Sequence, residues 1–452
     1  MKDSIHFNVM DYGARADGRT LDTKAFQDAV DRCADEGGGL VFVPAGRYLL
    51  GSLWLKSNVV FCLDAGAVLI ASLNPADYPL PDDIAPDSQP RACLNALHAE
   101  NIRVCGEGVV FGQVMSFSYD DPANGGNGEE HLTFDDPKQF RPKLLRFEDV
   151  RGAVLSGITF RESPFWTIHF AGCRDILVEN IRVENPLRAC NTDALDIDCC
   201  RNFTARGLYL QTGDDGVCVK SSPEVAKLYG GCENVRIEDC EIHSTSAALK
   251  VGTETFAPIR NVSFDDCSVF GSSHAIAVYA RDGGEVENIV FRNISGNAKA
   301  HGNAPRHKFR WSWWGAGDAV FISASPRRKG ESSGTIRNVV LKEIDIDCEN
   351  SCFSSSYPET GKVENIFLSE VKLRFVRQGT QPGGVFDETP SIRNRFPHRI
   401  PAFFFENIRN ASVEKSAVEW VNPEGECWDG LLENENSELL RFECTESVTQ
   451  SE

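Results

Sequence analysis

Apolar and polar residues alternate in short runs along most of the chain, and from about Asn101 onward these runs follow a recurring pattern. The unit begins with Asn or Asp and continues as apolar, x, apolar, x, x, apolar, x, apolar. Alternation with a period of two is typical of strands with one buried face. The unit starts at Asp175, Asn202, Asn234, Asn261, Asn288, Asn338, Asn365 and, in a degraded form, Asn410.

The spacing of the units identifies the fold class. The distances between their first residues are 27, 32, 27, 27, 50, 27 and 45 positions. A parallel β-helix requires such a period, because each coil of short strands stacks on the previous one around a continuous core. The alternative is a β-sandwich with strands roughly every 8–12 residues, which would not repeat a spacing of 27. We therefore predict an all-β, single-stranded parallel β-helix (solenoid), in which the two long steps hold a second coil or an inserted loop.

The N-terminal residues depart from this pattern. After a strand over residues 5–9, the apolar positions between Asp22 and Ala34 fall on one face of a helix. Thr20 or Asp22 can cap its start, and the glycines at 37–39 end it. We predict an N-terminal capping helix on a single β-helix domain of residues 1–452, with a cap region at 1–50 and C-terminal coils and a tail at 374–452.

Charge and composition narrow the choice of partners. The chain carries 66 acidic and 46 basic residues, a net charge of -20, which disfavours nucleic acid and anionic membranes. An acidic substrate would have to be bound by local Lys and Arg. No run of 18 apolar residues predicts a membrane span, and the N-terminus shows no signal peptide. We expect a cytoplasmic protein, of unknown oligomeric state, whose 16 cysteines are mostly reduced core thiols.

Candidate chemistry concentrates between Asn191 and Ser222. Two adjacent aspartates, Asp214 and Asp215, are unsuited to a core, since each carboxylate needs a partner and their repulsion raises one pKa. Asp193 lies 22 positions before Asp215, close to one coil, so the two should project from the same wall about 4.8 Å apart. Asp193 alone is equally well read as an Asx turn.

Two more aspartates, Asp196 and Asp198, are expected to be hydrogen-bonding or edge residues, with a minor role for Asp196 left open. Three carboxylates on one face suit glycoside hydrolysis, in which one protonated Asp donates to the leaving oxygen and the others activate water. A wide separation would give inversion and a close one a covalent route. Ca²⁺ coordination by the same three carboxylates is the alternative, although we expect no metal or other cofactor.

Three loop-like segments interrupt the repeats, at Ser116–Lys138, Asn297–Asp318 and Gln378–Arg399. Long loops inside a compact domain are usually functional or disordered. The second one mixes cations with aromatic residues, which suits a sugar carrying a carboxylate. A hydrophobic plug against the helix edge is the alternative. Its candidate binding residues are Arg310, Trp313 and Trp314, with Arg306 and Lys308 as further cations.

Four segments resemble glycoside hydrolase family 28, the polygalacturonases and their relatives. NTDALDI (Asn191–Ile197) and GDDGVCVKS (Gly213–Ser221) are similar to the family's two Asp motifs, and RPKLLRFEDV (Arg141–Val150) and SPFWTIHF (Ser163–Phe170) also look like family segments. The resemblance covers roughly residues 5–373. It implies a right-handed β-helix and an inverting hydrolase.

By position, the resemblance also implies roles for individual residues. Asp214 would be the general acid, Asp193 and Asp215 would hold the water, and Asn191 would help to orient the site. The segments Gly252–Thr255 and Trp313–Asp318 look like those of bacterial members thought to be exo-acting on oligosaccharides. The expected activity is therefore exo-hydrolysis of pectin-derived oligosaccharides, releasing a terminal galacturonate or related sugar.

The sequence also departs from the family. Ala247 replaces the His of a Gly-His-Gly motif, and the cations of an Arg-Ile-Lys motif are missing near Ala277–Ala280. Lys250, Arg281 and His274 lie nearby in the sequence and are candidates for substrate binding. Two other classes stay open: a calcium-dependent polysaccharide lyase and a non-catalytic carbohydrate-binding β-helix.

Overall fold

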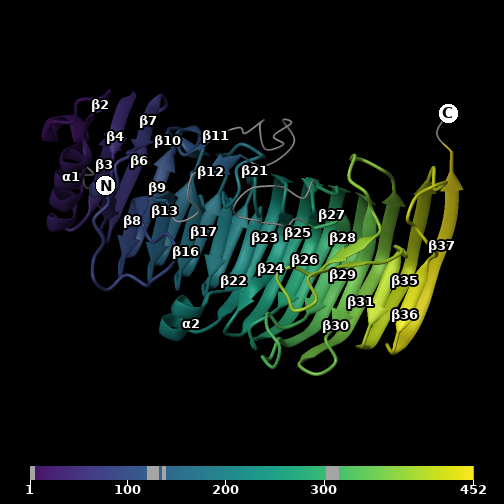
Figure 1. The fold of residues 1–452 in the computed structure, drawn as a ribbon. Helices are drawn as coiled ribbons and strands as arrows, with labels where there is room; N and C mark the ends of the chain where they lie inside the picture. The colour runs from purple at the N-terminus through teal and green to yellow at the C-terminus, as the bar shows by residue number, and fades with distance from the viewer. Residues whose placement is uncertain (1–5, 120–131, 135–138, 302–314, 451–452) are drawn as a thin grey trace.

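The chain forms a right-handed parallel β-helix, seen in a computed structural model that describes residues 6–119, 132–134, 139–301 and 315–450. Figure 1 shows the coils stacked along one axis, with helix α1 (Thr23–Asp35) at the N-terminal end and strand β37 (Leu439–Thr449) at the other. The predicted solenoid is confirmed. No helix in the described part of the chain is long and apolar enough to cross a membrane.

Two large parallel sheets make up the wall. In the described part of the chain, the first has 21 strands. They are β1 His6–Asn8, β2 Asp17–Leu21, β3 Gly39–Val43, β4 Gly46–Leu50, β6 Val59–Leu63, β7 Ala67–Ala71, β9 Glu100–Gly106, β10 Val109–Phe111, β14 Arg151–Ser156, β15 Thr159–Arg161, β17 Arg174–Glu179, β18 Arg182–Glu184, β20 Arg201–Arg206, β21 Tyr209–Thr212, β23 Cys232–Ser244, β25 Ile259–Ser272, β27 Glu285–Ala298, β29 Gly334–Cys348, β31 Gly361–Phe375, β35 Ile408–Val421 and β37.

The second sheet carries the functional residues and has 12 strands within the described ranges. They are β5 Leu53–Leu55, β8 Ala92–Leu97, β13 Lys143–Glu148, β16 Ile168–Ala171, β19 Leu195–Asp198, β22 Val217–Ser221, β24 Ala247–Thr255, β26 His274–Ala280, β28 Asp318–Ala324, β30 Asn350–Ser356, β34 Phe403–Glu406 and β36 Leu432–Glu435. Short elements outside the wall are β11 Ser118–Tyr119, β12 Thr133–Phe134, β32 Val385–Asp387, β33 Arg395–Pro397, η1 Val9–Tyr12, η2 Pro75–Asp77, η3 Val114–Ser116 and α2 Pro223–Tyr229.

The inner side chains form one continuous hydrophobic column. Within the second sheet, Leu195 pairs with Ile168 on one side and with Val217 on the other, so equivalent apolar residues stack from coil to coil. Neighbouring strand residues point to opposite faces. The residues between these apolar positions therefore face away from the column, and this alternation places polar side chains such as Asp196 and Lys220 on the outer face of the second sheet, where both are buried.

The Asn-led turns predicted from the repeat are present as a ladder along the helix. Asn261, for example, has a left-handed φ of 56°, and its side-chain amide donates to Asn234 Oδ1 at 3.1 Å. Asn288 in turn donates to Asn261 Oδ1 at 3.1 Å. The ladder runs directly from Asn288 to Asn338 and from Asn365 to Asn410, across both long steps. Each long step therefore contains an insertion between adjacent coils, not a second coil.

We expect Asn261→Ala to lower the free energy of unfolding by about 2 kcal/mol, because Ala is strained at positive φ and both ladder bonds are lost. Asn261→Gly keeps the backbone freedom and loses only the ladder, so it should cost about half as much. Urea unfolding of the two variants beside wild type measures both losses. A loss in Asn261→Gly equal to that in Asn261→Ala would contradict the role given to the turn.

The predicted N-terminal helix is present as α1, and the five apolar residues that define its face are all buried: Ala25, Phe26, Ala29, Val30 and Cys33. Asp22 is its N-cap residue, but its side chain makes no capping bond and instead accepts from the backbone amide of Arg15 at 2.7 Å. All 16 cysteines are free thiols, and most of them are buried.

Candidate active site

A pocket of about 440 Å³ lies on the outer face of the second sheet. Strands β22, β24 and β26 and the turns before β19, β22 and β24 supply most of its floor, and segments that follow β28 and β32 contribute to its side. A volume of this size is typical of small-ligand sites. The lining residues are Trp166, Asn191, Asp193, Asp214, Asp215, Cys218, Lys220, Pro223, Ser246, Ala247, Lys250, Gly252, Thr253, Glu254, Phe256, His274, Tyr279, Arg327, Thr389 and Pro390.

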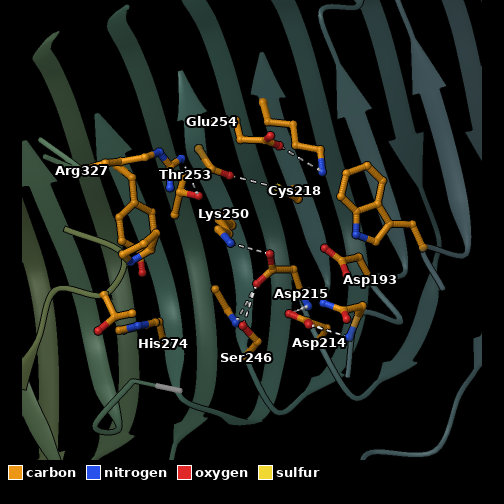
Figure 2. A pocket seen from close by; sticks show the side chains of 18 of the residues that line it. Asp193, Asp214, Asp215, Cys218, Ser246, Lys250, Thr253, Glu254, His274 and Arg327 are labelled. Carbon is orange, nitrogen blue, oxygen red and sulfur yellow. Dashed lines mark hydrogen bonds and ion pairs between the residues drawn. The ribbon is translucent and has the colours of Figure 1, made fainter. Parts of the chain in front are cut away.

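The three aspartates selected from the sequence meet in this pocket (Figure 2). One carboxylate oxygen from each of Asp193, Asp214 and Asp215 lies within 4.8 Å of the other two. Asp193 precedes β19, and the Asp pair precedes β22, the next strand in the same sheet. The backbone amide of Ala194 donates to the carbonyl of Asp215 at 2.9 Å, which ties the two turns together. Stacking of adjacent coils therefore brings the trio together.

The surroundings of Asp214 favour a protonated carboxyl. The side chain is buried, and burial followed by the charge of Asp215 raises its pKa to about 7. Its oxygens accept from the backbone amides of Asn191, at 2.8 Å, and of Asp215, at 3.0 Å. These bonds fix its orientation. Near neutral pH this group therefore exchanges a proton readily, as a general acid must.

Asp193 is the least satisfied member of the trio. Its Oδ1 is buried without a hydrogen-bond partner in the described part of the chain. Burial, followed by the charges of Asp214, Asp196 and Asp215, raises its pKa well above the usual value. A buried polar atom without a partner is costly unless it has a ligand or a water to bind. Asp193 therefore has an open acceptor position at the centre of the trio.

Lys250 contacts Asp215 and compensates its charge. Its Nζ lies 2.5 Å from Asp215 Oδ2, while Ser246 Oγ donates to Oδ1 at 2.8 Å and the amide of Ala247 at 3.2 Å. Ala247 occupies the position where the family motif has a His, and Figure 2 shows Ser246 and Lys250 bonded to Asp215. The trio has oxygen ligands close enough to hold a cation, but the lysine ammonium already provides the positive charge at Asp215.

A second group of possible ligand atoms lies in the C-terminal coils, away from this pocket. His398, Glu433 and Glu435 bring one atom each within 4.8 Å of the others, and all three are exposed or half-buried. Exposed acidic groups commonly gather in this way without a metal.

Asn191 orients Asp214 through the backbone. Its amide N–H is the donor to Asp214 Oδ2, and its own side-chain oxygen accepts from Arg141 Nη2 at 3.0 Å. Arg141 is buried, with its guanidinium over the rings of Phe134 and Phe165. The sequence reasoning placed Arg141 in a family-like segment without giving it a role. The structure makes it a support for the turn that carries Asn191.

The other predicted binding residues differ in whether they line the pocket. His274 lines the pocket, and its Nδ1 lies 3.0 Å from Asp318 Oδ2. Arg281 does not line it, which corrects the expectation that it binds substrate. Its guanidinium is fully buried and donates to the carbonyls of Ser323, at 2.8 Å, and Glu388, at 3.2 Å. The predicted Arg310, Trp313 and Trp314, with Arg306 and Lys308, lie outside the described residues.

The aspartates on β19 are buried, not at an edge. Asp196 lies 2.7 Å from Lys220 Nζ, and Asp198 accepts from the backbone amide of Ser222 at 2.9 Å. Lys220 Nζ also lies 3.2 Å from the centre of the Trp166 ring. Of the two expected roles, hydrogen-bonding or edge residue, Asp198 has the first, while Asp196 forms an ion pair that holds Lys220 beside the Trp166 ring at the pocket wall.

Sequence reasoning gave no binding role to Trp166, Lys220, Glu254 or Arg327. The first two lie in the quoted family-like segments, and Glu254 lies in GTET, so their position in a motif was a usable signal. Arg327 follows β28, far along the chain from the Asp motifs, and no motif marks it. It enters the pocket only because coils that are distant in sequence stack in space.

Comparison with known proteins supports the family. A model of "Glycosyl hydrolases family 28" matches residues 33–302, more than half of the chain. A "Probable polygalacturonase" of Vitis vinifera is 31% identical over 49% of this chain and 46% of its own length. An "Exo-poly-alpha-D-galacturonosidase" of Dickeya chrysanthemi is 29% identical over 46% of this chain and 41% of its own. The chain thus aligns with less than half the length of these two relatives.

Solved structures support the fold. The family 28 exopolygalacturonase of Yersinia enterocolitica matches 99% of this chain and 78% of its own with a TM-score of 0.70 and 19% identity. The exopolygalacturonase of Thermotoga maritima matches 98% of this chain and 92% of its own, with a TM-score of 0.64 and 20% identity. With the Asp motifs joined in one pocket of a β-helix and the family model matched across them, the chain belongs to glycosyl hydrolase family 28.

Proposed function

We propose that this protein is an exo-acting glycoside hydrolase that releases the terminal sugar, galacturonate or a related one, from pectin-derived oligosaccharides. The observation that carries the proposal is the convergence of three carboxylates in one pocket, one of them with its pKa raised to about 7. Paired carboxyl groups with different protonation are what hydrolysis of a glycosidic bond requires.

Each carboxylate has a distinct role in this reaction. Asp214 protonates the leaving oxygen as the glycosidic bond breaks. Asp215 forms an ion pair with Lys250, whose Nζ lies 2.5 Å from its Oδ2. Asp193 and Asp215 together hold the attacking water: the open Oδ1 of Asp193 is the acceptor that orients it, and Asp215 takes its proton.

The stereochemical outcome is a separate question, on which two arguments disagree. The resemblance to the family implies inversion. One oxygen of each carboxylate lies within 4.8 Å of the others, which is closer than the carboxyl separation of roughly 6.5–9.5 Å that is common among inverting enzymes. We propose inversion, because Asp193 and Asp215 share one water beside the acid and no carboxylate is left over as a nucleophile. Proton NMR of the first sugar released should show the opposite anomer to the substrate; retention would indicate a covalent intermediate.

Three features support exo action. The segment 376–402, inserted between β31 and β34, lines the pocket through Thr389 and Pro390. Arg281 holds this segment by donating to the carbonyl of Glu388, so we take the segment as a wall at one end of the pocket. The relatives from Dickeya chrysanthemi and Yersinia enterocolitica are named for exo activity.

The proposed substrate is an oligosaccharide, which a cell can import where a polymer cannot enter. We accordingly propose that the enzyme works in the cytoplasm. The 16 free thiols support this, since they suit a reducing compartment.

The test is incubation with oligogalacturonides of defined length, rhamnogalacturonan fragments and aryl glycosides, followed by product analysis with and without EDTA. We expect single sugars from the first minutes, saturated products, and no effect of EDTA. A random ladder of shorter oligomers would contradict exo action. Unsaturated products that disappear with EDTA would indicate the lyase, and binding without any product would indicate a carbohydrate-binding module.

A further inference from the structure

Arg327 presents part of its guanidinium to the pocket. Its Nε and Nη2 donate to the two carboxylate oxygens of Asp282, at 2.7 and 3.1 Å, and Nη2 also reaches Thr253 Oγ1 at 3.3 Å. Asp282 is itself held by the backbone amide of Thr255 at 3.1 Å. Among the described residues, no acceptor is paired with Nη1. The arginine is therefore fixed along one edge and leaves two N–H donors on the other.

The lysines that line the pocket in the described ranges are ion-paired, as Arg327 is, but they are more deeply buried. Lys250 is paired with Asp215, and Lys220 with Asp196. Their side chains are 14% and 4% exposed, whereas that of Arg327 is 27% exposed. Arg327 is thus the cation with the most surface to offer a ligand. Figure 2 shows it across the pocket from the aspartates, beyond Lys250 and beside Thr253.

A sugar that carries a carboxylate needs such a group here. The pocket wall includes four carboxylates, those of Asp193, Asp214, Asp215 and Glu254. The protein as a whole has a net charge of -20, so no general field attracts an anion. A planar guanidinium is well suited to hydrogen-bond a carboxylate, and a charge-assisted hydrogen bond of this kind is stronger than one between neutral groups.

We propose that Arg327 is the specificity-determining residue that binds the carboxylate of a uronic acid unit in the substrate. The inference deepens the proposed function and rests on it. The guanidinium lies level with β24 and the residues after β26, one to two coils beyond Asp215, or about 5–10 Å along the axis. The carboxylate it binds therefore belongs to the sugar in the cleavage pocket or to that sugar's immediate neighbour.

The experiment compares trigalacturonate with its fully methyl-esterified form, which keeps the shape and removes the charges. Wild type should prefer the acid in kcat/KM. In Arg327→Met this preference should fall by about 10- to 100-fold, mainly through KM, because a charge-assisted bond to the bound substrate is lost. Arg328→Met is the matched control: Arg328 is the next residue, 81% exposed, and pairs with Glu331 outside the pocket.

Folding is checked with a second variant, since Arg327→Met leaves Asp282 buried without its cation. The double variant Arg327→Met, Asp282→Asn removes both charges, and it should melt near wild type and show the same loss of preference. An unchanged preference in the double variant overturns the proposal, and so does an equal loss in Arg328→Met.

A binding measurement separates this proposal from the proposed function. Calorimetry on Asp214→Asn, with and without the Arg327 substitution, compares the two trisaccharides without turnover. Suppose that wild type cleaves neither compound, that Asp214→Asn binds the acid more tightly than the ester, and that the added Arg327→Met removes this difference. The carboxylate site is then supported, and the proposed hydrolysis of this substrate is refuted. If Asp214→Asn binds the acid no more tightly than the ester, the carboxylate site is refuted.

Discussion

Asp214→Asn should lower kcat by roughly 10²- to 10⁴-fold, the usual contribution of a general acid, while substrate still binds. An amide cannot supply the proton that Asp214 holds at a pKa of about 7. In wild type, the same group should make kcat/KM fall as pH rises through about 7, because the acid loses its proton. Steady-state kinetics between pH 4 and 9 measures both effects, and Asp345→Asn, an exposed aspartate of β29, is the control.

The same substitution should stabilise the fold at alkaline pH. The pKa of Asp214 is about 7 in the folded protein against a usual value of 3.8, so the folded state binds more protons between these values. Stability is therefore lost as pH rises toward 7, and the penalty is complete above it. At pH 8 the free energy of unfolding of Asp214→Asn should exceed that of wild type by on the order of a few kcal/mol, and its melting temperature should be higher. At pH 4 the gain should be small. Full activity, or equal melting at both pH values, would contradict a proton held on Asp214.

Lys250→Met should lower kcat by about 10- to 100-fold, as expected when a charge-assisted hydrogen bond is removed. Its ammonium compensates Asp215 and also lowers the pKa of Asp214. Without it, the pKa of Asp214 rises further. The alkaline limb of the kcat/KM profile should therefore move to higher pH, a change that a purely structural role would not produce.

Two control variants accompany this prediction: one keeps the positive charge at position 250, and the other removes an exposed lysine far from the pocket. Lys250→Arg keeps a cation beside Asp215 and should recover part of the rate with a smaller shift of the limb. Lys372→Met, at a 68% exposed lysine of β31, should leave rate and profile unchanged. A loss of rate with no movement of the pH profile would mean that Lys250 acts on the substrate, as the sequence reasoning had expected.

The fold was predictable because each coil repeats the same short sequence pattern, led by an Asn. An Asn at each turn adopts a left-handed φ and bonds to the Asn of the previous coil, so its spacing directly reports the length of a coil. The two long steps could not be assigned in advance, since an insertion and an extra coil give the same gap. Only the direct bond from Asn338 to Asn288 shows which is present.

The candidate site was predictable only in part. Asp193 lies one coil from the adjacent Asp214 and Asp215, so the repeat alone places the three on one wall. Arg281 and Arg327 both follow strands of the same sheet, but one donates into the protein and the other toward the pocket. Which way each turns depends on Glu388 and Asp282, partners that no local pattern marks.

The central claim is that the Asp trio adds water to a glycosidic bond. The most direct measurement is mass spectrometry of the products formed from an oligogalacturonide in H₂¹⁸O with EDTA present, by wild type and by Asp214→Asn. We predict one ¹⁸O atom at each new reducing end, in saturated products, with wild type alone forming them at a measurable rate. Unlabelled, unsaturated products, or equal labelling by Asp214→Asn, would contradict the account.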